Sequence, residues 1–311
     1  MTMTAEQQYD LDFQDTGATR TDLISQLERK GVFYTVELMD NYFRTPQGMK
    51  STGKKTVVNV DLEEAIGVVS ERYVPVLNKD IFTQFNKVLE NCKEIDLTDA
   101  YVEVQTNSNG ARILVEYVLP AHTVTLENGD EVALSITALN SFDGSTGFKV
   151  FCGGLRFKCM NGMILGSNIA SYHKKHCSGL SIAEAGKTIE TGIKAYLEGV
   201  DSWNNQIKTV VSGETCFTAL AELCDLETLG AKTYAGYKHL TQLAGDTRKK
   251  LIDDYMLILE DYVDELGQTE WALNNAITHI VTHGARGKKP SIQSQVTKTA
   301  KAREIIKKHL S

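Results

Sequence analysis

The chain has 311 residues, of which 42% are hydrophobic, and a formal net charge of −7. This length is enough to bury one large core or two of moderate size. No stretch approaches the roughly 18 consecutive apolar residues of a membrane span, and the acidic N-terminus lacks the apolar centre of a signal peptide. We therefore expect no membrane partner, a location in the cytoplasm, and reduced thiols for the six cysteines.

The basic residues are concentrated at the C-terminus. From Gly284 to Ser311, eight Lys or Arg stand against one acid, Glu304, which gives +7, so the remainder has 25 basic and 39 acidic residues and carries −14. The acidic remainder argues against a simple cationic DNA clamp, whereas a basic end is typical of a segment that contacts a polyanion. A solvated tail is the alternative interpretation.

The first third of the chain predicts a polar N-terminal segment with one short helix, then a loop, strands and a second helix. Thr21 and Asp22 can cap a short helix that Gly31 ends. Residues 41–55, NYFRTPQGMKSTGKK, combine Gly, Pro, Ser and Thr with cations and predict an exposed loop. Strands are expected at 55–61 and 66–77, and residues 78–91 have the apolar spacing of a helix.

The middle of the chain alternates apolar and polar residues, and the last third has helical periodicity. Strands are predicted over 101–106, 111–120, 123–139 and 147–160, with turn signals at NSNG and ENGD. Helices are predicted over 181–206, 216–226, 234–244, 247–265, 269–283 and 298–310.

These patterns predict an α+β fold, with a mainly antiparallel sheet in the first half and a helical second half. We expect an N-terminal arm with a basic loop (1–56), a β-rich core (57–166), a helical region packed on that core (167–285) and a basic C-terminal tail (286–311).

Cations and aromatic rings lie close together on the strand that follows residue 147. Phosphates need cations and every base has a face that can stack, so this mixture suits a nucleic-acid strand. Arg72, Arg156 and Lys158 would contact phosphates, and Tyr73 and Phe157 would stack on bases. The full set of predicted DNA-binding residues is Lys54, Lys55, Arg72, Tyr73, Lys149, Arg156, Phe157, Lys158, Lys174, Lys175, Arg286, Lys288, Lys289, Lys298, Lys301, Arg303, Lys307 and Lys308. Scattered surface lysines are the alternative.

Other motifs are poor matches to known chemistry. Residues 48–55 imitate a phosphate-binding loop, but Lys55 stands where Ser or Thr should hold magnesium, and a strand follows instead of a helix. His173, His176 and Cys177, with Cys152 and Cys159 upstream, offer metal ligands without a CxxC pair. No nucleophile elbow or spaced triad is present, so we predict no catalytic residue, metal or cofactor.

Three segments resemble motifs of one family. Residues 66–85 are similar to its GVVSxRYxPVxN opening, residues 141–166 to its DGS…RxxCxN core, and residues 269–285 to its TxWxxxNAxTxxxxH end. This is the phage/plasmid-like protein family, catalogued as a domain of unknown function. Phe142 replaces the histidine that precedes Asp-Gly in the family, which weakens any catalytic proposal at that position. The matching positions are Arg72, Tyr73, Pro75, Asn78, Asp143, Gly144, Arg156, Cys159, Asn161, Trp271, Asn275, Ala276 and His283.

The resemblance implies a bacteriophage or mobile-element protein. The chain is similar to the single-stranded-DNA-binding proteins of phages that encode their own RNA polymerases. One of these DNA-binding proteins serves as a transcription cofactor. We therefore predict a non-enzymatic, sequence-tolerant single-stranded-DNA-binding protein that assembles with itself and has phage RNA polymerase or replication proteins as partners. A protein-binding adaptor, and a metal- or thiol-dependent enzyme, are the alternatives.

Overall fold

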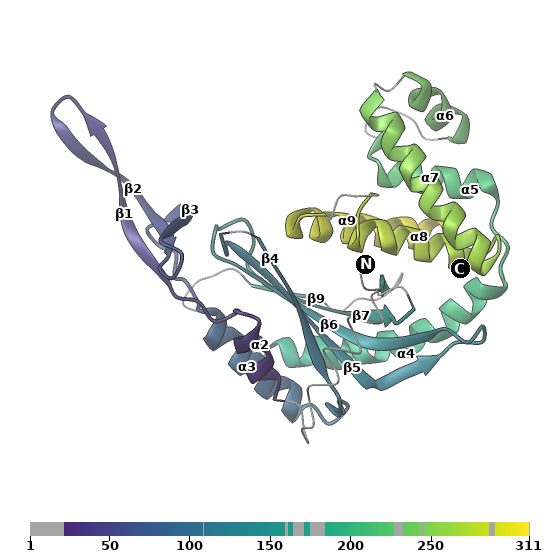
Figure 1. The fold of residues 1–311 in the computed structure, drawn as a ribbon, viewed down its shortest axis with the longest axis horizontal. Helices are drawn as coiled ribbons and strands as arrows, with labels where there is room; N and C mark the ends of the chain where they lie inside the picture. Colours follow the sequence, from purple (N-terminus) through teal and green to yellow (C-terminus); the bar gives the residue numbers. More distant parts are fainter. Residues whose placement is uncertain are drawn as a thin grey trace, which may run out of the picture.

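The computed structural model describes residues 22–107, 109–158, 161–163, 171–174, 184–226, 233–243, 246–285 and 290–310 (Figure 1). Its strands are β1 (Val36–Thr45), β2 (Gly48–Asn59), β3 (Glu64–Ser70), β4 (Tyr101–Thr106), β5 (Arg112–Thr125), β6 (Glu131–Ser141), β7 (Phe148–Arg156), β8 (Asn161–Met163) and β9 (Ser171–Lys174). Its helices are α2 (Leu23–Arg29), α3 (Asn78–Asn91), α4 (Ala185–Lys208), α5 (Gly213–Leu223), α6 (Tyr234–Leu243), α7 (Asp246–Leu266), α8 (Glu270–Thr282) and α9 (Ile292–His309).

The larger sheet is antiparallel, with strands in the order β4-β5-β6-β7-β8, and β9 also pairs with β7. The connections are short where the sequence has turn residues. Gly110 between β4 and β5, and Gly129 between β5 and β6, adopt φ values of 75° and 84°, which favour glycine. Both hairpin signals of the sequence are therefore confirmed.

Helices cover both faces of this sheet (Figure 1). One face of β5 places Val115 and Tyr117 in a core with α2, α3 and α4, where Phe85 and Trp203 are also buried. The opposite face lies against α8 and α9. Alternation along each strand produces these two faces, because successive side chains point to opposite sides of a sheet.

The helices after α4 build a second core. Buried residues of α5, α7, α8 and α9 share it, including Leu220, Tyr255, Ile277 and Ile306. Figure 1 shows α8 and α9 above the sheet and α5, α6 and α7 farther from it, at the upper right. The second half is thus helical and joins the sheet through α8 and α9, so the α+β prediction is confirmed.

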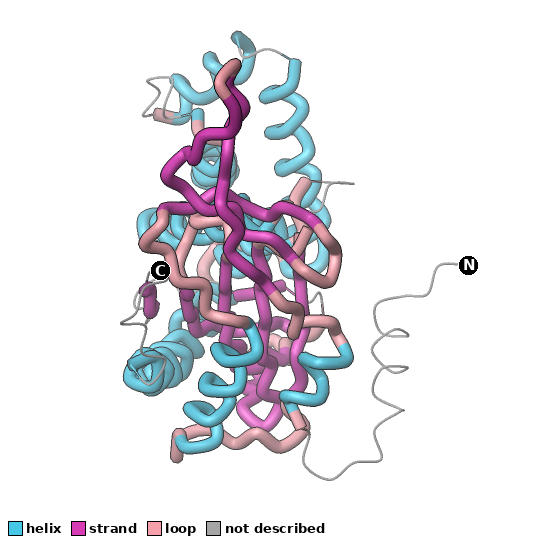
Figure 2. Tube along the Cα trace, turned by 90° about the vertical axis from the view of Figure 1, so that its left-hand side faces the viewer, coloured by secondary structure: helices cyan, strands magenta, loops and turns pink. Residues whose placement is uncertain are grey.

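A second, smaller antiparallel sheet has the order β1-β2-β3. Its base is packed, with Val36, Val57 and Phe142 in a small core. The distal part of the β1–β2 hairpin projects away from the rest of the molecule (Figure 1), and Figure 2 shows its strands in front of the helical layers. The loop predicted for residues 41–55 is wrong, since nearly all of this segment forms strands.

Two other expectations need correction. The strand predicted over 66–77 ends at Ser70, and helix α3 begins at Asn78. The predicted C-terminal tail contains α9, which begins six residues before the predicted helix because the Ser291 hydroxyl caps it by accepting a hydrogen bond from the Ser294 amide. Ala302, Ile305 and Ile306 of α9 are buried in the second core, so this segment is a packed helix.

We predict that Gly67→Ala destabilises the junction between the two sheets. A β-carbon at Gly67 would lie 2.6 Å from the Cα of Asp143, so the backbone must move. Overpacking of this kind costs about 1–3 kcal/mol of unfolding free energy. Gly213→Ala is the matched control, because no atom of the described residues lies within 4 Å of its added β-carbon. Denaturant unfolding should show a loss for Gly67→Ala alone, and equal midpoints would contradict the prediction.

Candidate nucleic-acid interface

The distal part of the β1–β2 hairpin, residues 41–55, which we call the arm, exposes apolar side chains. Tyr42 is 52% exposed, Phe43 49% and Met49 63%. Phe43 lies directly opposite Lys50, and Arg44 directly opposite Met49. Opposite residues of an antiparallel pair share a face, so each face of the arm has a cation beside an apolar side chain.

The arm is also strongly cationic. Residues 41–55 contain Arg44, Lys50, Lys54 and Lys55 and no acid, so they carry +4 and the remaining 296 residues, with 29 basic and 40 acidic side chains, carry −11. Lys55 forms an ion pair with Asp40 at the base of the arm. Among the described residues, Arg44, Lys50 and Lys54 form no ion pair and are exposed. Three cations are therefore available to an anionic ligand.

Local sequence explains why this segment is a hairpin. Thr45-Pro46-Gln47-Gly48 has proline and glycine at the positions a β-turn favours, and Thr45 pairs with Gly48. Gly53 has φ 67°, where β2 shifts register against β1 between Asp40 and Tyr42. The same Pro, Gly, Ser and Thr residues predicted a loop, because a hairpin exposed on both faces shows no alternation of apolar and polar residues.

The small sheet brings together some of the predicted DNA-binding residues. Lys54 pairs with Ser70, and Arg72 follows two residues later and is exposed. Lys54, Lys55 and Arg72 thus lie in one region.

Sequence reasoning missed Tyr42, Phe43, Arg44, Met49 and Lys50 as binding candidates. Their signal was a stretch with two rings, four cations and no acid.

Tyr73 is not available for stacking. Its ring packs in the small core with Val36 and Phe142, and its hydroxyl donates a hydrogen bond to the Ser141 carbonyl at 3.3 Å. Burial raises the pKa of Tyr73 well above its ordinary value. The predicted stacking role is corrected, because a half-buried ring in a core cannot present its face to a base.

Arg156 is also not available to a phosphate, which corrects the prediction. It is 0% exposed, and its Nη2 lies 2.7 Å from a carboxylate oxygen of Asp130 and 2.7 Å from one of Glu265. Asp130 also accepts a hydrogen bond of 2.8 Å from the Trp271 indole. The Asn275 side-chain oxygen lies 3.5 Å from Nη1 of Arg156. Arg156, Trp271 and Asn275, three positions of the family motif, therefore form one buried polar network.

The network changes the titration of both carboxyl groups. Burial alone would raise the pKa of Asp130, but the hydrogen bonds from Arg156, Trp271 and Asn128 outweigh it, and the pKa is lowered. Burial would likewise raise the pKa of Glu265, but the hydrogen bonds from Arg156 and Lys158 outweigh it. The pKa of Glu265 is therefore also lowered. Both acids therefore stabilise the fold when ionised, and this contribution is lost as pH falls through their folded-state pKa values.

The remaining predicted residues of the larger sheet do not gather into one groove. Lys149 and Phe157 are both half-buried on β7 or just after it, and Phe157 packs against Val118, Ala133 and Leu155. Lys158 is exposed and pairs with Glu265 at 2.9 Å. The backbone of Lys174 pairs with Phe148 in β9, and its side chain and all of Lys175 lie outside the described residues.

Most cations of α9 that were predicted to bind DNA are held by groups of the protein itself. Lys301 pairs with Asp225, and Lys308 pairs with Glu222 at 2.6 Å. Lys298 donates to the Tyr255 hydroxyl at 2.7 Å. Arg303 is half-buried and Lys307 is exposed, whereas Arg286, Lys288 and Lys289 lie outside the described residues. Intramolecular pairing leaves α9 less cationic toward solvent than its sequence suggests.

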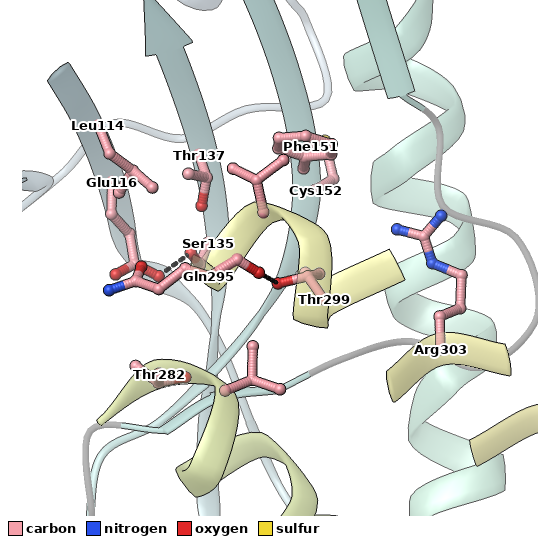
Figure 3. Close-up of a pocket in the computed structure, with 13 residues that line it drawn as sticks. Leu114, Glu116, Ser135, Thr137, Phe151, Cys152, Thr282, Gln295, Thr299 and Arg303 are labelled. Carbon is pink, nitrogen blue, oxygen red and sulfur yellow. Dashed lines mark hydrogen bonds between the residues drawn. The ribbon is translucent and has the colours of Figure 1, made fainter. Parts of the chain in front are cut away.

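A small cavity with a mainly apolar lining and a few polar side chains lies between the sheet and α8 and α9 (Figure 3). Glu116 and Thr137 line it from the strands, and Gln295, Thr299 and Arg303 line it from α9. Glu116 accepts a hydrogen bond from Ser135, and burial raises the pKa of its carboxyl. At about 120 Å³, the cavity is below the roughly 300–1,000 Å³ of small-molecule sites, so it does not accommodate a nucleotide.

The described cysteine thiols are buried, and most of the candidate metal ligands lie outside the described residues. Cys92, Cys152, Cys216 and Cys224 are buried, and burial raises the pKa of each thiol. Groups of His, Cys, Asp and Glu that could hold a metal are absent from the part of the chain that the structure covers. The candidate ligands His176, Cys177 and Cys159 lie outside it, as does the side chain of His173.

The fold and its projecting arm define an α+β protein with a sheet covered on both faces and a cationic hairpin. The family described as "Domain of unknown function (DUF932)" matches residues 65–306, and the chain belongs to it. This agrees with the resemblance to an uncharacterised domain family. The match includes most of β3, the motif network and most of α9, and begins after the arm. No curated protein matches the chain. No solved structure matches it.

We predict that Arg156→Leu lowers the free energy of unfolding by about 3–5 kcal/mol, since it leaves a buried carboxylate without its partner. Lys158→Leu is the matched control, because it removes the exposed cation from the same Glu265 and should cost about 0–1 kcal/mol. Denaturant unfolding at neutral pH measures both. Similar losses for the two variants would show that the buried network is not the stronger interaction.

We also predict that stability falls as pH decreases from about 6.5 toward 4. Burial, with a smaller effect of His283, lowers the pKa of His279 to about 4, and Tyr262 and Asp261 are its other neighbours. Below the unfolded value of about 6.5 the unfolded chain binds a proton that the folded chain does not, so stability is lost. His279→Gln should reduce the slope of the unfolding midpoint against pH between pH 6.5 and 4. An unchanged slope would contradict this assignment.

Proposed function

We propose that this protein binds single-stranded DNA with little sequence preference through the arm. The observation that carries the proposal is the combination of exposed Tyr42, Phe43 and Met49 with the exposed cations Arg44, Lys50 and Lys54 on one projecting hairpin. Cations attract the phosphates, and the rings provide stacking surfaces that every base can use.

The charge distribution supports a local mode of binding. The arm carries +4 and the remaining chain −11, so the body repels a polyanion that the arm attracts. Duplex DNA is a poorer ligand for this surface, because its bases are already stacked and cannot reach the rings. Arg72, which follows β3, lies beside the arm and extends the cationic region toward the body.

The biological setting that we propose is a bacteriophage or other mobile element, with action in replication, recombination or early transcription in the cytoplasm of the host. The resemblance to the phage/plasmid-like proteins supports this setting. Self-assembly on DNA, and a phage RNA polymerase or replication protein as partner, belong to the same proposal. In the described ranges, no helix is both long and apolar enough to cross a membrane.

A protein-binding adaptor is the second candidate, because the exposed Tyr42, Phe43 and Met49 also suit an apolar groove on another protein. The two functions differ in their requirement for DNA. An adaptor forms a stable complex with its protein partner when DNA is absent, and that complex loses affinity on substitution of the rings but changes little with the arm cations.

We predict that Phe43→Ala weakens binding to a fluorescent single-stranded oligonucleotide by about 1–3 kcal/mol, the contribution of one stacked base. Fluorescence anisotropy at near-physiological salt measures this. Leu62→Ala, at an exposed apolar residue between β2 and β3, is the control and should bind like the unsubstituted protein. Equal affinity for duplex and single strands, or no effect of Phe43→Ala, would oppose stacking on the arm.

We further predict that neutralising Arg44, Lys50 and Lys54 together with glutamine reduces the salt dependence of binding. Each phosphate contact contributes about 0.7 to the slope of log affinity against log salt for a single strand, so the slope should fall by about 2. Glutamine at Lys79, Lys87 and Lys187, three exposed helix lysines, is the control with the same change in net charge. Equal slope changes in the two triple variants would indicate a nonspecific charge effect.

These variants are preferable to deletion of the C-terminal segment. Removing the last 28 residues would take α9, with its buried Ile305 and Ile306, out of the second core. A loss of binding would then report unfolding as well as lost cations. Substituting Lys307, which is exposed on α9, tests the basic end while leaving the core and the Lys308–Glu222 ion pair in place.

A further inference from the structure

We propose that two copies of the chain pair antiparallel through the outer edge of β1, around a twofold axis at Asn41. β1 pairs with β2 on one side only, and within the described ranges its other edge has no neighbouring strand. This open edge is 10 residues long. An unpaired edge presents backbone donors and acceptors to any strand that can align with it.

The side chains of β1 do not protect this edge. Protected edge strands commonly contain lysine, proline or a bulge of their own. β1 has no lysine or proline, and where the register shifts the extra residues belong to β2, with Asn41 of β1 facing the Thr52–Lys54 stretch. Met39 is 49% exposed, Tyr42 52% and Phe43 49%. A second strand would place apolar side chains of its own beside these, on the same faces of the sheet.

The sequence of β1 selects the register. A twofold axis perpendicular to a sheet places one residue opposite itself and keeps opposite side chains on one face. With Asn41 at the axis, Met39 of each copy lies opposite Phe43 of the other, so the dimer has two such pairs. Sulfur-aromatic contacts of this kind are favourable. Moving the axis to Asp40 would set two carboxylates against each other and Glu37 against Phe43.

The polar residues also fit the register at Asn41. Asp40 of one copy lies opposite Tyr42 of the other, where the phenol can donate to the carboxylate. Within one chain the Tyr42 hydroxyl already lies 3.4 Å from Asp40 Oδ2, so the two side chains share a face. Arg44 lies diagonally across from Asp40 on that face. Within one chain the Asn41 amide donates to the Thr56 hydroxyl at 2.9 Å and accepts from the Thr52 hydroxyl at 3.2 Å, and its second N–H can donate to the Asn41 of the other copy at the axis.

The paired hairpins would form one continuous sheet in the order β2-β1-β1-β2. Each face would then carry the rings and cations of two arms side by side. This inference names the self-partner of the proposed DNA-binding arm and rests on that function only for its biological use. Because the interface consists of one strand pair, we expect association that depends on concentration.

Cysteine cross-linking tests the register. In a Cys159→Ser, Cys177→Ser background, Asn41→Cys places two thiols across the axis, at the short separation of directly opposite residues. Mild oxidation should give a covalent dimer on a nonreducing gel. Met39→Cys and Phe43→Cys should each cross-link poorly alone and efficiently when mixed. Leu62→Cys, at a 52% exposed position in the turn between β2 and β3, is the collision control.

Sedimentation supplies the second measurement. The unsubstituted protein should associate with rising concentration. Met39→Lys, which puts a lysine opposite Phe43, should raise the dissociation constant of the dimer at least tenfold. Leu62→Lys should leave it unchanged. A monomer at every concentration, or mixed cross-linking no greater than that of Leu62→Cys, overturns the proposal. Oligonucleotide binding is measured on the same samples. A monomer that binds DNA refutes the strand pairing alone, and a dimer that does not bind DNA refutes the proposed function alone.

Discussion

The buried ion pair between Arg156 and Asp130 is the interaction on which the arrangement of the two halves depends. Arg156 ends strand β7, Asp130 lies in the turn before β6, and Glu265 of α7 completes the charge balance around the guanidinium. Trp271 of α8 donates to the same Asp130. A buried cation requires this set of partners, since an uncompensated charge in the interior is strongly unfavourable. The sheet and the helices must therefore meet in one geometry.

The network divides the cations of the chain into two classes. Arg156, and the α9 lysines Lys301 and Lys308, neutralise acids of the body and hold elements together. The unpaired cations of the arm make no such contribution. Basic residues that stabilise a fold are not available to a ligand, so the number of lysines and arginines in a segment is a poor guide to binding. A projecting hairpin without acids is a better one.

Much of the fold could be predicted because its signals are local. The alternation in β4 and the helical spacing of α3 each arise from neighbours within one element, and the Asp22 cap of α2 depends on an amide two residues away. The arm was predicted as a loop because its strands bury neither face and so lack alternation. The candidate site was placed on β7 because cations and rings are adjacent there in sequence, although Arg156 is buried and Phe157 half-buried in the structure.

The sequence by itself determined the class of fold, the position of most helices and strands, and the absence of acids between residues 41 and 55, since all of these follow from residue types and short-range periodicity. Only the tertiary structure decided which cations face solvent. Arg156 meets Glu265 across 109 residues and Lys308 meets Glu222 across 86, and no local pattern shows such contacts. Long-range packing brings the charges of the body together, and it leaves the cationic hairpin extended and accessible.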